Sequence, residues 1–175
     1  MNPVDDILKG YEVKKGEIRK RLSEFKDVLN QSEQVRPFLQ AVRFADNKSK
    51  YLVAARKLFS GDGRISIKDK LSETKNDPVL LRDWLLDNVK GLGMKATSHF
   101  IRNIGLTKNQ LAILDVHILK NLKEFGVIDE IPKSLTKKRY LEIEARMKKF
   151  ADRLGIMLDE LDLLLWSKET GVIFK

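Results

Sequence analysis

Apolar side chains recur at intervals of three and four residues along most of this chain, the spacing at which they share one face of an α-helix. Gly, Pro, Asp and Ser residues between the apolar stripes mark the predicted helix ends. The pattern predicts helices at residues 3–30, 35–42, 49–59, 78–89, 94–104, 115–125, 136–154 and 158–169. Residues 63–68 alternate as a strand would, but too briefly to build a sheet, and residues 60–78 as a whole are predicted to be a long connection. The chain is therefore predicted to be all-α.

The break between two of these helices has an unusual form, with two glycines one residue apart and a new helix immediately afterwards. Residues 89–96 read Val-Lys-Gly-Leu-Gly-Met-Lys-Ala. Gly91 and Gly93 allow backbone angles that other residues resist, and they leave no side chain between the turn and an approaching backbone. Leu92 can pin the turn to the core. An ordinary helix end with a glycine cap is the alternative, but it needs one glycine rather than two. The pattern favours a helix-hairpin-helix element.

The amide groups of such a turn suit a phosphate. N–H groups at a helix N-terminus point outward without intrahelical partners, so they attract anions. Lys90 and Lys95 would add positive charge beside them. By itself, this arrangement predicts sequence-independent contact with a DNA backbone through Lys90, Gly91 and Gly93.

Asp115 stands between an apolar run and a new helical stripe, in the segment Leu-Ala-Ile-Leu-Asp-Val-His. The simplest interpretation is an N-cap, because an aspartate side chain accepts hydrogen bonds from the first amides of a helix. A second observation suggests more, since one helix and a linker separate Asp115 from Lys95. Hairpin, lysine and aspartate in this order resemble the helix-hairpin-helix DNA glycosylase superfamily over residues 87–122, although the usual proline before the aspartate is absent.

Composition favours one class of partner and excludes several kinds of reactive site. The chain has 34 Lys and Arg against 25 Asp and Glu, a net charge of +9 and a pI near 9.6, which suit a polyanionic partner. The absence of cysteine excludes disulfides, thiolate zinc sites, cysteine nucleophiles and iron–sulfur clusters. The longest apolar run is too short to span a bilayer, so a soluble intracellular protein is expected. His99 and His117 stand apart from any carboxylate cluster in the sequence, so we assign them structural roles and expect no metal site.

Separated stretches carry a more specific resemblance. The segments GLGMKATSHFIRNIG and LAILDVHILKNL, with the final LLLWSKETGVIFK, resemble the archaeal-type (type 2) 8-oxoguanine DNA glycosylase/AP lyase family, which the first 85 residues match less plainly. The resemblance implies an all-α fold of two helical lobes with a cleft between them. The expected lobes are residues 32–112, a barrel-like lobe ending in the hairpin at about 80–105, and residues 1–31 together with 113–175.

The resemblance also implies a base-excision repair enzyme that flips 8-oxoguanine out of the duplex, excises it and cleaves the abasic site, a bifunctional DNA N-glycosylase and AP lyase. Lys95 would attack the deoxyribose C1′ and form a Schiff base that permits β-elimination, which an oxygen nucleophile could not do. The amine must be uncharged to attack, which requires desolvation or nearby positive charge. Asp115, facing Lys95 across the cleft, would stabilise the oxocarbenium ion. A solvated lysine at a helix start is the alternative interpretation of Lys95.

Three further residues are candidates for contact with the lesion. Trp166 and Lys175 would recognise the flipped base, although a tryptophan on an apolar face is as often a core residue. Asn47 would fill the space that the base leaves, although a turn asparagine is the simpler interpretation. Which carboxylate or carbonyl reads the N7–H of 8-oxoguanine stays open.

The expected partner is double-stranded DNA containing oxidised guanine, bound by a monomer in the cytoplasm or nucleoid of a prokaryote, without membrane contact. We expect no resident cofactor; the resemblance allows a monovalent cation at the hairpin. Two alternatives remain: a helix-hairpin-helix glycosylase for another damaged base, and a non-enzymatic protein that uses the hairpin as a phosphate clamp. The missing cysteines argue against oxidised pyrimidines as the substrate, and Lys95 argues against alkylated purines.

Overall fold

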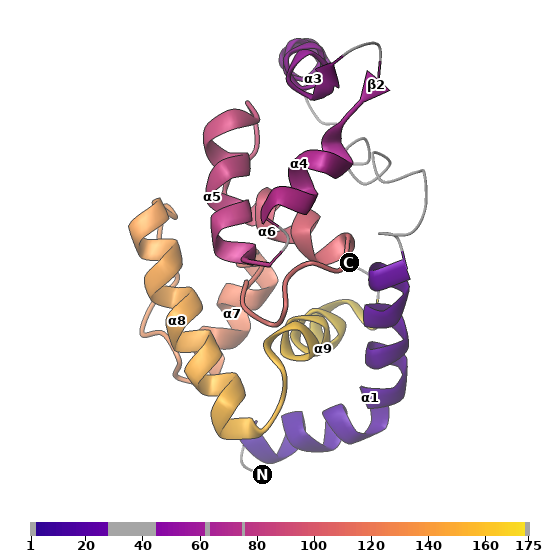
Figure 1. Cartoon of the computed structure of the whole chain (residues 1–175). Helices are drawn as coiled ribbons and strands as arrows, with labels where there is room; N and C mark the ends of the chain where they lie inside the picture. The colour runs from indigo at the N-terminus through magenta and orange to yellow at the C-terminus, as the bar shows by residue number, and fades with distance from the viewer. Residues whose placement is uncertain (1–2, 28–44, 62–63, 75, 174–175) are drawn as a thin grey trace. The chain divides into compact units, whose positions relative to one another are not determined.

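A computed structural model describes residues 3–27, 45–61, 64–74 and 76–173 of the 175-residue chain, and Figure 1 shows the course of its helices. The helices are α1 (Pro3–Asp27), α3 (Ala45–Phe59), α4 (Ile67–Thr74), α5 (Pro78–Asn88), α6 (Met94–Asn103), α7 (Val116–Glu124), α8 (Lys137–Leu154) and α9 (Leu158–Thr170). The strands β1 (Ser60–Gly61) and β2 (Arg64–Ile65) form one short antiparallel pair, with Ser60 opposite Ile65. The all-α prediction is confirmed. The helix predicted at 35–42 lies outside the described residues.

The predicted long connection at residues 60–78 is wrong in part, because it contains α4 as well as the strand pair. Ser66 precedes the helix and its hydroxyl donates to the Phe59 carbonyl at 3.1 Å. Ile67 and Leu71, one helical turn apart, are both buried. Two apolar positions between polar, glycine-rich flanks are too few for helical periodicity to stand out, so the sequence pattern missed this helix.

The chain divides into two compact units: residues 26–108, which we call the hairpin unit, and residues 1–25 with 109–175, which we call the α9 unit. In the hairpin unit, α5 and α6 pack against each other. Leu81, Leu85, Ile101 and Ile104 form their shared core, each with 0% of its surface exposed. Burial of these side chains stabilises the two helices that carry the glycine turn.

In the α9 unit, α9 is covered by α1, α7 and α8 (Figure 1). The buried leucines of α9 are Leu158, Leu161, Leu163, Leu164 and Leu165. They lie on more than one face of the helix, as expected of a helix enclosed by its neighbours. Glu160 is 2% exposed, and it accepts hydrogen bonds from the Tyr11 hydroxyl at 2.5 Å and from Nε of Arg19 at 2.8 Å. These bonds compensate the buried charge and tie α1 to α9.

Candidate active site

The turn between α5 and α6 requires glycine at Gly91. Its φ of +89° lies in the left-handed region that other residues resist, as expected from the sequence. A β-carbon at this position would also lie 2.5 Å from Cδ2 of Tyr51, whose ring reaches the turn from α3. Both the backbone angle and the tyrosine therefore exclude a side chain at Gly91.

Gly93 differs from Gly91. Its φ of −100° and ψ of 173° are extended angles that any residue adopts, so the expectation of a special backbone angle is wrong at this position. A β-carbon on Gly93 would meet no atom within 4 Å. The space beside it is open, which agrees with the other expectation, that glycine leaves room for a backbone approaching from outside.

The N-terminus of α6 presents amide groups and lysines at the surface. The carbonyl of Gly93 accepts hydrogen bonds from both N and Oγ1 of Thr97 at 3.0 Å, which starts the helix, and no described side chain caps its first amides. Lys95 is the second residue of α6 and is exposed, as is Lys90 in the turn. Within the part of the chain that the structure describes, Lys95 forms no hydrogen bond or ion pair. Its amine is therefore accessible at the surface.

Asp115 caps α7, as the sequence predicts. Its Oδ1 accepts hydrogen bonds from the backbone amides of His117 at 3.0 Å and Ile118 at 2.9 Å. The residue is 6% exposed. Two fixed amide donors and burial hold the carboxylate in one place at the N-terminus of a helix, where the helix dipole favours negative charge.

The segment before Asp115 is held by α8. Oε1 of Glu144 accepts a hydrogen bond from the Ala112 amide at 2.8 Å. The Tyr140 hydroxyl donates to the Ala112 carbonyl at 2.7 Å and accepts from the Leu114 amide at 3.1 Å. The apolar side chains of this segment are also buried. The hydrogen bonds to α8 therefore help to set the position of the Asp115 carboxylate, in addition to its bonds to α7.

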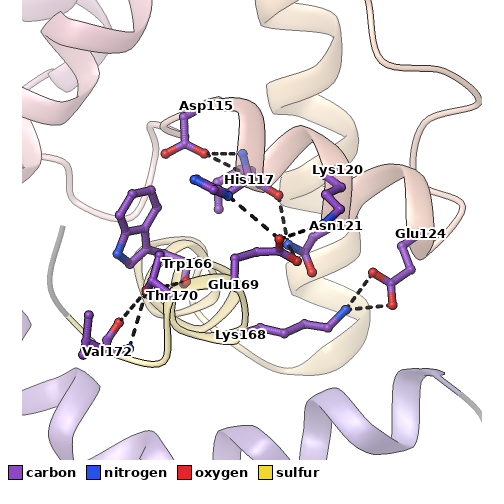
Figure 2. Close-up of polar contacts among 11 residues, drawn as sticks. Asp115, His117, Lys120, Asn121, Glu124, Trp166, Lys168, Glu169, Thr170 and Val172 are labelled. Atoms are coloured by element: carbon purple, nitrogen blue, oxygen red, sulfur yellow. Dashed lines mark hydrogen bonds and ion pairs between the residues drawn. The ribbon is translucent and has the colours of Figure 1, made fainter.

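His117, Trp166 and Glu169 form a cluster between α7 and α9 that the sequence analysis missed (Figure 2). The ring centroids of His117 and Trp166 lie 5.0 Å apart, with the rings nearly perpendicular at 88°. Nδ1 of His117 lies 3.9 Å from Oε2 of Glu169, a single carboxylate from α9 that the sequence did not place beside this histidine. Trp166 and Glu169 are three positions apart on one helix, a spacing that places them on the same face and could have signalled the cluster.

The Glu169 carboxylate has two further partners on α7. Nζ of Lys120 donates to Oε2 at 3.0 Å, and Nδ2 of Asn121 donates to Oε1 at 3.3 Å. The hydrogen bond from Lys120 lowers the pKa of Glu169 below its ordinary value, although burial opposes the shift. Glu169 is therefore a carboxylate at neutral pH, with both oxygens committed to α7 side chains.

The end of α9 and the predicted inserting residue are described in part. Gly171, with φ of +77°, ends the helix, and Ile173 beyond it is buried with 7% exposure. Lys175 lies outside the described residues. Asn47 lies in the first turn of α3, and its side chain also lies outside the described part of the structure. Trp166 is half-buried, so its burial does not decide between a core residue and a base-stacking surface.

The described residues bring no three His, Asp or Glu side chains together in the way a metal site requires. None of the helices in this part of the chain is sufficiently long and apolar to cross a membrane.

The sequence is similar to sequences of known proteins. Residues 13–156 match the family model Ogg-HhH, described as 8-oxoguanine DNA glycosylase. A Fusobacterium nucleatum protein named 8-oxoguanine DNA glycosylase/AP lyase is 50% identical over 144 residues, which cover 82% of this chain and 65% of the relative. A Methanocaldococcus jannaschii protein of the same name is 40% identical over 133 residues, covering 76% of this chain and 60% of the relative. The chain thus spans less than two thirds of the length of these relatives.

Solved structures share the fold. The crystal structure of the Methanocaldococcus jannaschii 8-oxoguanine DNA glycosylase superposes with a TM-score of 0.80 at 30% identity, covering 98% of this chain and 95% of that chain. The structure of the M. jannaschii glycosylase/lyase in complex with a 15mer DNA containing 8-oxoguanine gives a TM-score of 0.78 at 31% identity, covering 96% and 99% of the two chains.

Proposed function

The chain belongs to the 8-oxoguanine DNA glycosylase family, and on that premise we propose that it excises 8-oxoguanine from double-stranded DNA and then cleaves the strand at the abasic site. The observation that carries the proposal is the accessible amine of Lys95, in the first turn of α6 directly after the glycine turn. A lysine in this place can supply a nucleophile beside a bound phosphate. The same residue type explains both reactions, because an amine that displaces the base remains bonded to the sugar.

Lys95 is the proposed nucleophile. Its Nζ lone pair forms a bond to C1′ of the deoxyribose while the bond from C1′ to N9 of 8-oxoguanine breaks, and the base leaves with the electron pair and takes up a proton. The bond between C1′ and O4′ then opens and gives a Schiff base. Loss of a proton from C2′ expels the 3′ phosphate by β-elimination. Lys95 must lose its proton before attack, because only the neutral amine has a lone pair to form the bond to C1′.

Asp115 is the proposed partner of the charge that develops on the sugar. Positive charge grows on C1′ and O4′ as the base departs, and a carboxylate placed nearby stabilises it. Burial and the two amide hydrogen bonds support this role, because a fixed charge with little access to water needs no reorganisation during the reaction. The carboxylate can also accept and return protons during ring opening.

The remaining candidates bind the DNA. The amides of Gly91, Gly93 and the start of α6, with the charge of Lys90, would hold a backbone phosphate. Trp166 and Lys175 would receive the flipped base and Asn47 would fill its place in the duplex. We further propose that the protein acts as a monomer in the cytoplasm or nucleoid of a prokaryote. The reaction as written uses side chains of this chain alone, without a resident cofactor.

Borohydride trapping tests the proposal. With duplex DNA carrying 8-oxoguanine, the wild-type protein should form a covalent adduct when the Schiff base is reduced. Lys95→Gln should give no adduct while still binding the DNA. Lys70→Gln is the control, because Lys70 lies on another helix, α4, and forms an ion pair with Glu73 at 3.1 Å.

Two outcomes would contradict the proposal in different ways. If the wild-type protein gives no adduct on lesion or abasic DNA, it is not a lyase and the phosphate-clamp alternative applies. If it gives an adduct but prefers another damaged base in a panel of lesion duplexes, the reaction type stands and the substrate is wrong.

A further inference from the structure

The cluster of His117, Trp166 and Glu169 takes no part in the bond-breaking steps written above, yet it lies at the start of the helix that Asp115 caps. We propose that His117, anchored by Glu169, is a positioning residue that fixes the indole of Trp166 for the base removed in the reaction. The inference rests on the proposed excision of 8-oxoguanine, in which Trp166 receives the flipped base.

The imidazole of His117 restrains the indole by an edge-on contact. The two rings are 5.0 Å apart at 88°, the arrangement in which the positive edge of one aromatic ring meets the negative face of the other. Trp166 is half-buried, whereas Leu165 and Ser167 on either side of it are buried. An indole with exposed surface can rotate unless a neighbour limits it. Among the described residues, His117 provides such a neighbour through its ring contact with Trp166.

The backbone of His117 is fixed by the catalytic carboxylate itself. Its N–H donates to Oδ1 of Asp115 at 3.0 Å. The ring that restrains Trp166 and the carboxylate proposed to act on the sugar therefore project from the same turn. Figure 2 shows these two side chains next to each other at the start of α7. In the proposed reaction, this shared turn would link the position of the base-stacking surface to that of the carboxylate beside the sugar.

Glu169 holds His117 from the other side. Its carboxylate is fixed by hydrogen bonds from Lys120 and Asn121, and its Oε2 lies 3.9 Å from Nδ1 of His117. Lys120 and Asn121 lie on α7 with His117, so the helix that carries the imidazole also positions the Glu169 carboxylate. The imidazole thus has a fixed carboxylate and the indole as neighbours.

Glu169 could simply join α7 to α9. A second ion pair joins the same two helices and allows this simpler role to be tested separately. Nζ of Lys168 on α9 contacts both carboxylate oxygens of Glu124 at the C-terminal end of α7 at 2.7 Å. This pair links the same two helices without contacting His117 or Trp166. Glu124 therefore offers a matched control, since its loss weakens the helix pair and leaves the aromatic contact in place.

Comparing base excision with cleavage of abasic DNA distinguishes a residue that positions Trp166 from one that supports the whole fold. A base is present during excision, whereas a preformed abasic site has none for Trp166 to hold. His117→Ala should therefore lower the single-turnover rate of 8-oxoguanine excision by about two- to tenfold, the value of one aromatic pair, and leave cleavage of abasic DNA unchanged. His117→Phe should retain most of the excision rate, because it keeps an aromatic edge. Glu169→Gln should give a smaller loss than His117→Ala, and Glu124→Gln none.

Fluorescence of Trp166 gives a second readout that does not depend on activity. The chain has 2 tryptophans, so Trp84→Phe leaves Trp166 as the sole emitter. In that background, His117→Ala and Glu169→Gln should increase quenching by acrylamide, because the indole gains freedom and access to water. Glu124→Gln should not.

The outcomes that overturn the inference are distinct. If His117→Ala changes neither excision nor quenching, His117 does not position Trp166. If it lowers excision and abasic cleavage equally, His117 acts on the DNA backbone or on the fold. If Glu169→Gln matches Glu124→Gln in both measurements, Glu169 is not the anchor. A wild-type protein that cleaves abasic DNA but never releases 8-oxoguanine would instead refute the proposed function, before any variant is compared.

Discussion

Asp115 combines an observed structural role with a proposed chemical role in one side chain. Oδ1 caps α7 through two amides, while the charge of the carboxylate is what the proposed reaction uses. An asparagine at this position would keep an oxygen for the cap, because asparagine and aspartate are equally good N-cap residues, but it would remove the charge. The two roles can therefore be separated by a single substitution.

Asp115→Asn should lower 8-oxoguanine excision by at least about 100-fold, the scale of a lost electrostatic or proton-transfer group, with little change in Tm. Asp77→Asn is the matched control, since Asp77 caps α5 with the same geometry, accepting from Val79 at 2.9 Å and Leu80 at 3.0 Å. Excision rates and thermal unfolding of both variants are the measurements. Near-normal excision by Asp115→Asn would mean that the cap alone explains the aspartate.

The two turn glycines should respond differently to alanine. Gly91→Ala should destabilise the protein by about 1–2 kcal/mol or more, because the left-handed angle and the Tyr51 ring both oppose a β-carbon. Gly93→Ala should have a smaller effect on unfolding but should weaken DNA binding. Urea unfolding and fluorescence anisotropy with a labelled duplex measure the two effects. Unchanged DNA affinity in Gly93→Ala would show that no backbone approaches this side of the turn.

At the scale of helices, two ion pairs join α7 to α9. Lys120 of α7 pairs with Glu169 of α9, and Lys168 of α9 pairs with Glu124 of α7. Lys120 lowers the pKa of Glu169 in the folded protein. The folded state thus binds fewer protons than the unfolded chain in the acidic range, and the stabilisation by Glu169 is present above the ordinary glutamate pKa. It is lost as the pH falls through that value toward the lower folded one.

Glu169→Gln should therefore cost stability at neutral pH and progressively less as the pH falls. The cost should stay below about 1 kcal/mol, because Lys120 is largely exposed with 63% of its side chain accessible. Urea midpoints of the wild type and the variant, compared at neutral pH and at about pH 4, give the measurement. A difference between the two proteins that grows on acidification would contradict the assigned shift.

The helix ends were more predictable from sequence than the contacts between helices. Asp77 and Asp115 cap helices where capping residues precede apolar stripes, and Gly155 ends α8 in the left-handed conformation. These features depend on neighbouring residues. The contact of Asn121 with Glu169 joins positions 48 apart, so no local pattern contains it. The contact of Glu169 with the His117 ring was hidden for the same reason.

At the scale of the whole molecule, the net charge of +9 should dominate DNA affinity. The logarithm of the binding constant should fall linearly with the logarithm of salt concentration, because each phosphate contact releases counterions. Lys90→Ala should make that slope shallower by about 0.9, the contribution of one phosphate contact. Titrations at several salt concentrations measure it, with Lys70→Ala as the control. An unchanged slope in Lys90→Ala would remove Lys90 from the DNA interface.

The bond between Tyr11 and Glu160 joins residues 149 positions apart, with the whole hairpin unit between them. During synthesis, α1 leaves the ribosome long before its partner α9. Until then the apolar face that α1 buries in the finished protein, with Ile7 and Ile18, has nothing to cover it. The hairpin unit, which is contiguous, can fold earlier. A nascent chain arrested before α9 emerges should therefore expose α1 to proteases and chaperones, and emergence of α9 should end that exposure.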